Sequence, residues 1–300
     1  MQRSVSPVEI ATKDRPASVS VIVPAYNCER WIRSCLDSIL ASDYPTELME
    51  VICVDNASTD GTPQILEDYR SAVTVVRETK RGASAARNAG LREASGPLVA
   101  FTDADCIVDP AWLRHIVEPI QSGTADAAGG KIRARPGAGL VELFGELIHD
   151  HSKAITRSRP PYVITMNMSA PLELLRAVGC FDERWIRLQD VDLSFRILAA
   201  GGRFAYTPDA VVYHHNRETL PALAREGFLH GYLRPRFFEV HGEFIRSYRE
   251  NHPVQQHSPR PETVDAAQRL EPWRIALYRS VFNAGKKAGE IRGRLFPVKS

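Results

Sequence analysis

The segment "VSVIVPAYN" (Val19–Asn27) decides the fold class of this chain. It is a short run of β-branched and apolar residues that stops at Pro24, which is typical of a buried strand. The residues after it repeat with helical spacing, and the apolar positions are Trp31, Cys35, Leu36, Ile39 and Leu40. A strand followed directly by a helix is the first unit of an α/β fold.

The same alternation continues through the first hundred or so residues. "EVICVDNASTDGT" predicts a second strand that ends at Asp55, and Pro63 opens the helix after it. The next segments predict a strand, a helix and a fourth strand, and they read "AVTVVRE", "ASAARNAGLREAS" and "PLVAFTD". Short loops between alternating strands and helices predict a parallel, doubly wound sheet, whose ligands bind beyond the carboxyl ends of the strands.

Polar residues follow three of these strands. Asn27, Asp55 and Asp103 each stand at a strand end, so all three should line one crevice. Taken singly, each is also explained as a turn residue or helix cap, but together they favour a site. In "FTDADCIVDP" a further carboxylate, Asp105, stands close to Asp103. Carboxylates so close repel one another unless water or a cation screens them, which makes this a candidate cation site.

Composition excludes several classes of protein. The chain has 300 residues, 44% of them hydrophobic, and a net charge of +2, which argues against a general nucleic-acid binder. Its five scattered cysteines form no CxxC pair, so we expect a reducing, cytoplasmic location. The polar residues 1–17 are expected to form a flexible leader rather than a signal peptide, and no later run approaches the roughly 18 apolar residues that span a bilayer.

The crevice lacks the usual nucleotide loops. The first strand is followed by no G-x-G-x-x-G turn, which argues against a dehydrogenase, and there is no G-x-x-x-x-G-K-[ST] loop. What remains is a diphosphate held by a metal, because "TDADC" supplies the hard oxygen ligands that Mg²⁺ or Mn²⁺ prefers. Nearby, Lys80, Arg81 and Arg87 surround Gly82 at a helix start, a plausible setting for anionic oxygens.

Seven segments in this order resemble the family 2 glycosyltransferases of the GT-A fold. They are "VSVIVPAYN", "EVICVDNASTDGT", "GASAARNAG", "AFTDADCIVDPAWL", "VGCFDERW", "QDVDLSFRILAAGGRF" and "PDAVVYHH". The resemblance covers about residues 18–215. It implies a Rossmann-like doubly wound mixed sheet and an inverting transfer of a sugar from a nucleoside-diphosphate donor to an acceptor hydroxyl, usually with a divalent cation. Among nucleoside diphosphates, UDP is the favoured donor nucleotide.

The resemblance assigns residues of the first half to the donor. Asp55 reads the base, Asp103 faces the ribose or the water shell of the metal, and Asp105 ligates the metal. The remaining nucleotide-sugar contacts that it implies are Pro24, Ala25, Tyr26, Asn27, Glu29, Asn56, Ser58, Gly82, Arg87, Asn88 and Ala104. Asp109 is different, because Pro110 and an apolar helical pattern follow it; we expect it to be a helix N-cap.

The second half is expected to hold the base and the acceptor. Asp190 starts a predicted helix, where the helix dipole favours an ionised carboxylate, and an inverting transfer needs a carboxylate to take the proton of the acceptor hydroxyl. Family members commonly carry Glu-Asp at this point, whereas this chain has Gln189 before Asp190. Asp192 is expected to cap or support that helix. Asp182 and Trp185 join Gln189 and Asp192 as predicted acceptor or supporting residues.

A histidine is the second expected metal ligand. Strand alternation lets only one of His214 and His215 point into the site. The family often uses a histidine here, and His214 aligns better with the family pattern. A surface histidine without a ligand is the alternative reading.

Beyond residue 215 the chain is expected to form a helical extension over 216–256, a linker over 257–270 and a basic amphipathic tail over 271–300. The tail has more basic than acidic residues, and Trp273, Leu277 and Val281 recur at every fourth position. One hypothesis is peripheral contact with the anionic inner face of the plasma membrane, near a lipid-linked acceptor. The alternative is a helix packed on the catalytic domain with a solvated basic face.

The sequence thus predicts a metal-dependent transferase whose partners are a nucleoside-diphosphate sugar and a saccharide or lipid-linked acceptor of cell-surface polysaccharide or glycoconjugate synthesis. Two alternatives are a sugar nucleotidyltransferase and a non-catalytic nucleotide-sugar-binding or scaffolding protein. The first would want a Gly-rich basic loop after the first strand, and "VPAYNCERW" provides none. The second is disfavoured by the presence of Asp103, Asp105 and Asp190.

Overall fold

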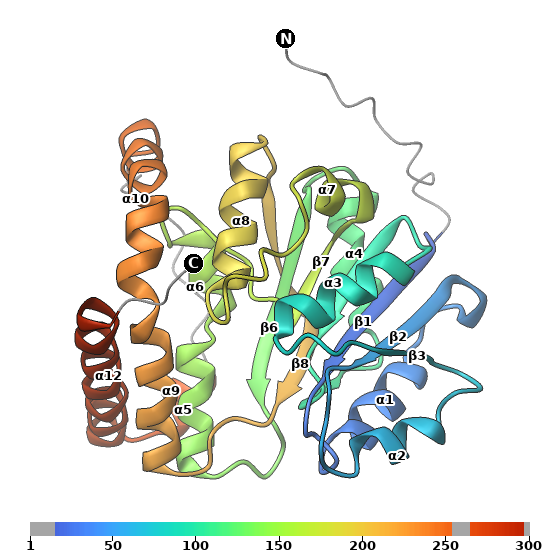
Figure 1. Ribbon diagram of the computed structural model, residues 1–300, viewed down its shortest axis with the longest axis horizontal. Helices are drawn as coiled ribbons and strands as arrows, with labels where there is room; N and C mark the ends of the chain where they lie inside the picture. Colours follow the sequence, from blue (N-terminus) through green and yellow to red (C-terminus); the bar gives the residue numbers. More distant parts are fainter. Residues whose placement is uncertain (1–15, 254–264, 297–300) are drawn as a thin grey trace.

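The computed structural model describes residues 16–253 and 265–296, and over these it shows an eight-stranded mixed sheet with helices on both faces (Figure 1). The spatial order of the strands is β3-β2-β1-β4-β7-β6-β8-β5. Their bounds are β1 Val19–Ala25, β2 Met49–Asp55, β3 Thr74–Arg77, β4 Leu98–Thr102, β5 Cys106–Val108, β6 Ala127–Ala134, β7 Asn167–Pro171 and β8 Phe204–His214.

The pairing of the strands confirms the doubly wound mixed sheet. β1 pairs in parallel with β2 and β4, and β2 pairs in parallel with β3. β7 runs antiparallel between β4 and β6, and β6 pairs in parallel with β8 apart from a register shift. The helices are α1 Ile32–Leu40, η1 Thr46–Leu48, α2 Thr62–Glu67, α3 Ala83–Glu93, α4 Trp112–Gln121, α5 Leu140–Ile148, α6 His151–Thr156, α7 Leu172–Ala177, α8 Gln189–Ala199, α9 Leu220–Tyr232, α10 Arg234–Asn251, α11 Asp265–Arg269 and α12 Pro272–Leu295.

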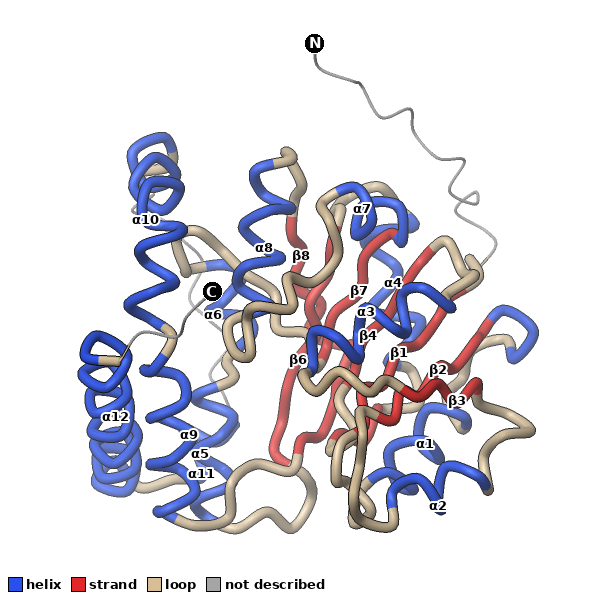
Figure 2. The backbone as a smooth tube through the Cα atoms, viewed as in Figure 1, coloured by secondary structure: helices blue, strands red, loops and turns tan. Residues whose placement is uncertain are grey.

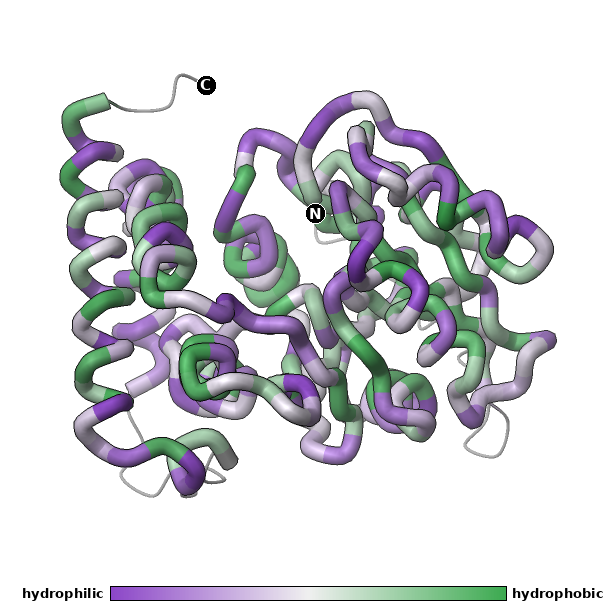
Figure 3. The backbone as a smooth tube through the Cα atoms, turned by 90° about the horizontal axis from the view of Figure 1, so that it is seen from below, coloured by the Kyte–Doolittle hydropathy of each residue, from purple (hydrophilic) through white to green (hydrophobic). Residues whose placement is uncertain are grey.

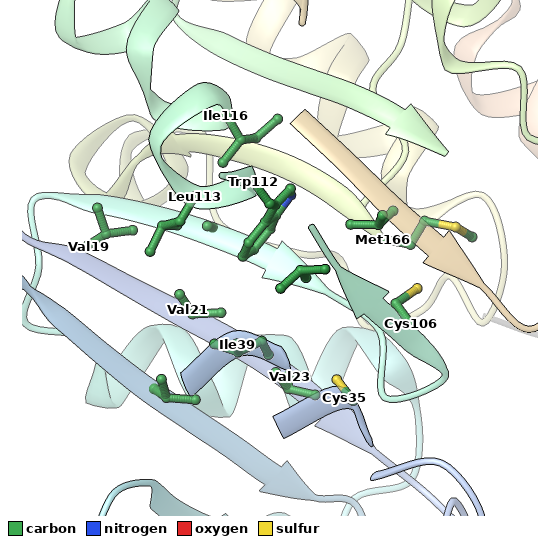
Figure 4. Packing of buried hydrophobic residues seen from close by; sticks show 14 of the residues in the cluster. Val19, Val21, Val23, Cys35, Ile39, Cys106, Trp112, Leu113, Ile116 and Met166 are labelled. Carbon is green, nitrogen blue, oxygen red and sulfur yellow. The ribbon is translucent and has the colours of Figure 1, made fainter. Parts of the chain in front are cut away.

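Alternation along β1 divides the core between the two faces of the sheet. Val21 packs with the buried sides of α1 and α4, as Figure 4 shows around Trp112 and Ile39. Its neighbour Ile22 packs on the opposite face with residues of α3, α7 and α8. A strand buried on both faces needs apolar residues at every position, which explains the continuous run in "VSVIVPA".

Two sequence-based expectations need correction. The N-cap of α4 is Ala111, not Asp109, although the Asp109 carboxylate does accept a hydrogen bond from the Ala111 amide at 3.1 Å. The expected linker 257–270 is not unstructured throughout: α11 lies within it, and Leu270 is buried among residues of α5 and α12. Residues 1–15, 254–264 and 297–300, which hold most of the leader, the rest of the linker and the end of the tail, lie outside the described residues.

The last helix packs on α9 through glycines. Figure 2 shows α9 and α12 side by side, at the far edge of the molecule from β3. Five glycines line this contact: Gly227 and Gly231 of α9 and Gly285, Gly289 and Gly293 of α12. A Cβ added to any of them would overlap the backbone of the opposite helix. The two backbones are therefore in direct contact, in the way that small residues at every fourth position allow. The described part of the tail is therefore a helix packed on the rest of the protein, and membrane contact of its outer face stays a prediction.

Gly231→Ala is expected to destabilise the protein by about 1–3 kcal/mol, because its Cβ would meet the backbone of Lys286 and helices repack at such a cost. Gly242→Ala is the matched control, since Gly242 lies in α10 with open space around it. There a helical alanine should stabilise by about 0.5–1 kcal/mol. Urea unfolding of both variants measures the difference, and equal stabilities would contradict the described packing.

The outer face of α12 carries apolar side chains. Trp273, Leu277, Ile291 and Leu295 are exposed, and arginines and lysines flank them. Figure 3 shows the resulting alternation of hydrophobic and hydrophilic residues along this helix. Of the described helices, none combines the length and the apolar character needed to cross a membrane.

A buried histidine ties α6 to the sheet. His151 Nδ1 lies 2.9 Å from the Gly130 carbonyl, and its Nε2 accepts a hydrogen bond from the Ile164 amide at 2.7 Å. Both contacts are satisfied only by the neutral ring. Burial lowers the pKa of His151 from 6.5 to about 3.

This histidine should make the protein sensitive to acid. Because the pKa of His151 is lower in the folded state than in the unfolded chain, its contribution to stability is present above pH 6.5 and is lost as the pH falls toward 3. Between pH 6.5 and 3, we expect His151 to lower the free energy of unfolding by up to about 1.4 kcal/mol for each pH unit. Urea unfolding at several pH values should show a shallower acid slope for His151→Gln. His115→Gln on α4 is the control, and an unchanged slope in His151→Gln would refute the assignment.

Candidate active site

The carboxyl ends of the parallel strands are joined by a network of loop contacts. Asn27, with a positive φ of 47°, accepts from the Thr59 amide at 2.8 Å and donates its own amide to Ser58 Oγ at 3.1 Å. The buried Asp55 accepts from the Ser58 amide at 3.1 Å. Asn56 binds the loop between β3 and α3, because its Oδ1 accepts a hydrogen bond from the Gly82 amide at 2.7 Å. The structure therefore brings together the loops that the sequence assigned to the nucleotide.

Side chains at the rim of this crevice are more exposed. Tyr26, at 46% exposure, lies under the guanidinium of Arg81, whose Cζ is 5.1 Å from the ring centroid. Pro24 and Ala25 end β1 directly before Tyr26. The Glu29 carboxylate accepts from the Gly61 amide at 2.6 Å, so it braces the loop that precedes α2. Tyr26 and Arg81 thus offer a flat, cationic surface on which a base could stack.

Helix α3 begins at this crevice and fastens the second half of the chain. Gly82, at φ 136°, precedes its first turn in a conformation that glycine adopts readily. Asn88 donates to the Phe181 carbonyl at 2.8 Å and to Glu183 at 2.9 Å, and Lys80 pairs with Glu183 at 2.6 Å. The predicted contact of Asn88 with the nucleotide stays a prediction, because here its amide holds the loop after α7.

Arg87 is buried beside Asp103. Its Nη2 lies 2.6 Å from Asp103 Oδ1, and only 3% of the Arg87 side chain is exposed. Among the described residues, its Nε and Nη1 have no hydrogen-bond partner. A buried guanidinium with spare donors is costly unless an anion is nearby, and Asp103 satisfies only one nitrogen. Ala104 is buried between the two carboxylates and leaves them room.

Asp105 faces His214 across the β5–β8 pair. His214 Nε2 lies 3.5 Å from Asp105 Oδ2, and its Nδ1 lies 2.7 Å from Oδ1 of Asn216. Burial alone would lower the pKa of His214, yet Asp105 raises it to about 9. Burial alone would raise the pKa of Asp105, which His214 and Arg217 instead hold below its ordinary value. His215 points away and stacks on Trp31, with ring centroids 3.9 Å apart.

These residues fit a divalent cation that is completed by a diphosphate. No group of three or more histidine, cysteine, aspartate or glutamate side chains in the described ranges is placed to hold a metal by itself. Mg²⁺ and similar ions are commonly held by one or two protein ligands together with substrate phosphates and water. Asp105 and His214 would be those two, and the contact of Asn216 with Nδ1 leaves Nε2 of the histidine toward Asp105.

Behind the histidine lies a buried polar cluster that sequence reasoning missed. Glu226 of α9 pairs with Arg217 at 2.9 Å, and it lies 3.6 Å from His149 and 3.8 Å from His230. Burial would raise the pKa of Glu226, but the two histidines and Arg217 hold it well below its usual range. The His149 ring packs edge-on against His214 at 5.3 Å. The cluster thus connects the back of the predicted metal site to helix α9.

Asp190 lies in the first turn of α8, two residues after a strained residue. Leu188 has φ 64°, a left-handed conformation that is costly for a residue with a Cβ and that often marks functional sites. Burial raises the pKa of Asp190, and the Val191 amide, Arg87 and His230 offset part of that rise. In the described part of the chain, the buried Oε1 of Gln189 receives no hydrogen bond. Asp190 Oδ1 accepts from the Val191 amide at 2.9 Å. A carboxylate next to an amide oxygen with no partner suits a hydroxyl-bearing ligand.

Asp192, which was expected to cap or support α8, makes buried contacts on the side of this helix. It is buried, pairs with Arg196 at 2.6 Å and lies 3.0 Å from Nε2 of His241 on α10. Asp182 binds Arg184 on its own loop at 2.7 Å. Trp185 is buried against Phe237 of α10, with ring centroids 5.4 Å apart. These residues hold α8 and its loop against α10, and their contacts with an acceptor stay predictions.

The sequence is similar to a known family and to curated relatives. The profile of glycosyl transferase family 2 matches residues 20–181, more than half of the chain. Glycosyltransferase AglE of Haloferax volcanii is 29% identical over 204 residues, which are 66% of this chain and 67% of AglE. Succinoglycan biosynthesis protein ExoO of Rhizobium meliloti is 32% identical over 68% of this chain and 62% of its own. A third relative is TarS of Staphylococcus aureus, a poly(ribitol-phosphate) β-N-acetylglucosaminyltransferase, which is 34% identical over 132 residues. The matched part of this chain spans less than two thirds of the length of ExoO and 23% of the length of TarS.

Solved structures share the fold over nearly the whole chain. A mannosyltransferase from Pyrobaculum calidifontis, in complex with GDP-Man and Mn²⁺, has a TM-score of 0.63 at 23% identity and covers 98% of this chain and 92% of its own. TarS residues 1–349 of S. aureus, in complex with UDP-GlcNAc, give a TM-score of 0.55 at 18% identity over 93% and 92% of the two chains. At these identities the likeness establishes the fold, including the expected GT-A type.

Proposed function

The chain belongs to glycosyl transferase family 2, and from this premise we propose an inverting, metal-dependent transfer of a sugar from a nucleoside diphosphate to an acceptor hydroxyl. The observation that supports the proposal is a buried arginine that acts on carboxylates from both halves of the chain. Arg87 pairs with Asp103 and acts electrostatically on Asp190, and Asp105 stands two residues after Asp103, beside His214.

Asp190 is the proposed general base. As the acceptor oxygen attacks the anomeric carbon, the bond from that carbon to the diphosphate oxygen breaks, and the hydroxyl proton passes to the Asp190 carboxylate. Burial raises the pKa of Asp190, so its ionised carboxylate is a better proton acceptor than that of an ordinary aspartate. Gln189 Oε1 is placed to accept a hydrogen bond from a neighbouring hydroxyl of the acceptor.

Asp105 and His214 are the proposed ligands of a divalent cation, with Mn²⁺ favoured. When bound, the cation neutralises the diphosphate leaving group. The chain's own contribution is to hold the donor: Asp55 accepts from the base, Tyr26 and Arg81 flank it, and Arg87 keeps Asp103 in place. UDP is the favoured nucleotide, and the complexes of UDP-GlcNAc and GDP-Man with structural neighbours support a nucleotide sugar in general.

The proposed acceptor belongs to a cell-surface polysaccharide or other glycoconjugate. The names of the relatives support this class, since ExoO is a succinoglycan biosynthesis protein and TarS acts on poly(ribitol-phosphate). Membership of the family excludes the sugar nucleotidyltransferase alternative. A purely scaffolding role is disfavoured because Asp103, Asp105 and Asp190 are all present, and the first two lie beside Arg87 and His214.

Nucleotide binding tests the donor site directly. We expect UDP, among UDP, GDP, dTDP and CDP, to raise the melting temperature only when Mn²⁺ is present. A ligand at a hundred times its Kd stabilises the folded state by about 2.7 kcal/mol. A shift with none of the four nucleotides would refute the proposed donor site, and a shift with another of them would reassign the base.

We further propose a cytoplasmic enzyme that contacts the inner face of the plasma membrane. All five cysteines are unpaired, which suits a reducing compartment. The exposed apolar residues of α12, together with flanking arginines, suit an anionic lipid surface. A Trp273→Ser, Ile291→Ser double variant should sediment less than wild type with phosphatidylglycerol vesicles. Equal sedimentation of the two proteins would refute the contact.

A further inference from the structure

A groove of about 430 Å³ lies beside the start of α8. Its walls come from the loop 158–162, from α8, from α9 and α10, and from α12 through Lys286. Segments far apart in the sequence therefore meet there, and nothing in the donor site described above uses them.

The groove is strongly cationic. Arg159, Arg234, Arg249, Lys286 and His230 all line it, and none of the described residues that line it is acidic. Arg234 pairs with Glu290 outside the groove at 3.2 Å, and Arg249 Nε donates to the Arg159 carbonyl at 3.0 Å. Nη2 of Arg159 is buried without a hydrogen-bond partner in the described chain. Such a concentration of positive charge in a concave site favours an anion with several oxygens.

One side of the groove is apolar. Phe237 and Phe238 of α10 lie next to Leu188, Val191 and Ile245. Phe238 is 45% exposed, and the guanidinium of Arg234 lies over its ring at 5.1 Å. A fully ionic ligand would not need this wall. The groove suits a molecule in which an anionic group is joined to an apolar one.

The groove begins at the proposed base. Leu188 and Val191, which line it, flank Gln189 and Asp190 in the sequence. Tyr162 and His230 line it as well, and each interacts electrostatically with Asp190. Arg87, which pairs with Asp103, also acts on Asp190. Asp190 therefore adjoins the groove, next to Val191 in the first turn of α8.

We propose that the groove binds the phosphate or diphosphate of an acceptor whose sugar is joined through that group to an apolar chain. This inference rests on the proposed function, because it names the acceptor class of the same enzyme. Phosphate oxygens bind between Arg159, Arg249 and Lys286, and the apolar chain follows Phe237 and Phe238. The phosphate takes no part in bond making; it positions the sugar so that a hydroxyl reaches Asp190.

Dodecyl phosphate, below its micelle concentration, is the probe for this site in the full-length protein. We expect it to raise the melting temperature, whereas dodecyl maltoside and inorganic pyrophosphate have much weaker effects because each lacks one half of the ligand. Lys286→Gln and Arg249→Gln should each weaken dodecyl phosphate binding roughly tenfold, the usual scale of one charged hydrogen bond. Arg279→Gln, on the exposed side of α12, is the matched control and should change nothing.

Binding of UDP with Mn²⁺ is measured in parallel and should be equal in all variants. This inference is wrong, while the donor site stands, if the nucleotide binds and dodecyl phosphate does not. It is also wrong if dodecyl phosphate binds Lys286→Gln and Arg249→Gln as tightly as wild type. Equally tight binding of pyrophosphate would refute the apolar half of the inference, and tight binding of dodecyl maltoside would refute the anionic half. If the wild-type protein did not bind UDP with Mn²⁺, the proposed function would be refuted instead.

Discussion

Replacing Asp190 by asparagine is expected to lower kcat for sugar transfer by about 10²–10⁴-fold, the usual contribution of a positioned general base. The amide keeps the shape of the side chain and cannot take the acceptor proton. Binding of the donor nucleotide should stay unchanged, because Asp190 lies on the acceptor side of Arg87. Steady-state rates with saturating donor and acceptor, together with nucleotide titrations, measure the two effects separately.

The stability of this variant gives an independent check. Because burial raises the pKa of Asp190, its charged form is disfavoured in the folded state, and the ionised side chain costs stability above that pKa. Asp190→Asn should therefore melt no lower than wild type at neutral pH. Asp192→Asn, two residues away, should melt lower because it breaks buried pairs with Arg196 and His241. Transfer by Asp190→Asn at the wild-type rate would rule out its role as the base.

Asp105→Asn is expected to abolish the Mn²⁺-dependent part of nucleotide binding. The substitution removes the carboxylate charge beside His214 and leaves an amide, which is a weaker ligand for a hard cation. At UDP and Mn²⁺ concentrations that stabilise wild type by about 2.7 kcal/mol, the variant should show almost no shift in melting temperature. Calorimetric titration of Mn²⁺ into the UDP-bound protein would give the same result directly.

Two further variants bracket this effect. Asn216→Ala should weaken Mn²⁺ binding by about 10–100-fold, because it releases the ring of His214 without removing a ligand. Asp109→Asn is the control: Asp109 follows β5 and its carboxylate accepts from the Ala111 amide in the turn before α4, so metal binding should not change. A metal-dependent shift in Asp105→Asn equal to that of wild type would contradict the assignment of Asp105.

The nucleotide-binding half could be predicted because its strands are apolar throughout and its polar residues stand at strand ends. The rest of the sheet gave weaker signals. β6 reads "AAGGKIRA", and its central glycines look like a turn. They are required by contacts with distant residues: a side chain at Gly129 would overlap the His151 ring, and one at Gly130 would overlap the Ala210 carbonyl. Such requirements exist only once the chain has folded.

The site residues divide in the same way. That Asp105 and His214 lie close together could be expected, because each belongs to a short motif near the end of a strand. The contact of Asn216 with His214 is also local, since the two residues are two positions apart at the end of β8. Glu226 and His149 could not be expected, because they reach the histidine from α9 and from the end of α5, and no local pattern links these segments.

The direct backbone contact of α9 and α12 limits how the C-terminal segment can be studied. Deleting residues 271–300 would leave the glycine face of α9 open to water and would also remove Lys286 from the groove beside α8. A truncated enzyme would thus lose folding stability, acceptor binding and lipid contact at the same time. Point substitutions on the outer surface of α12 separate these effects, so the segment is best treated as an integral wall of the enzyme rather than as a detachable anchor.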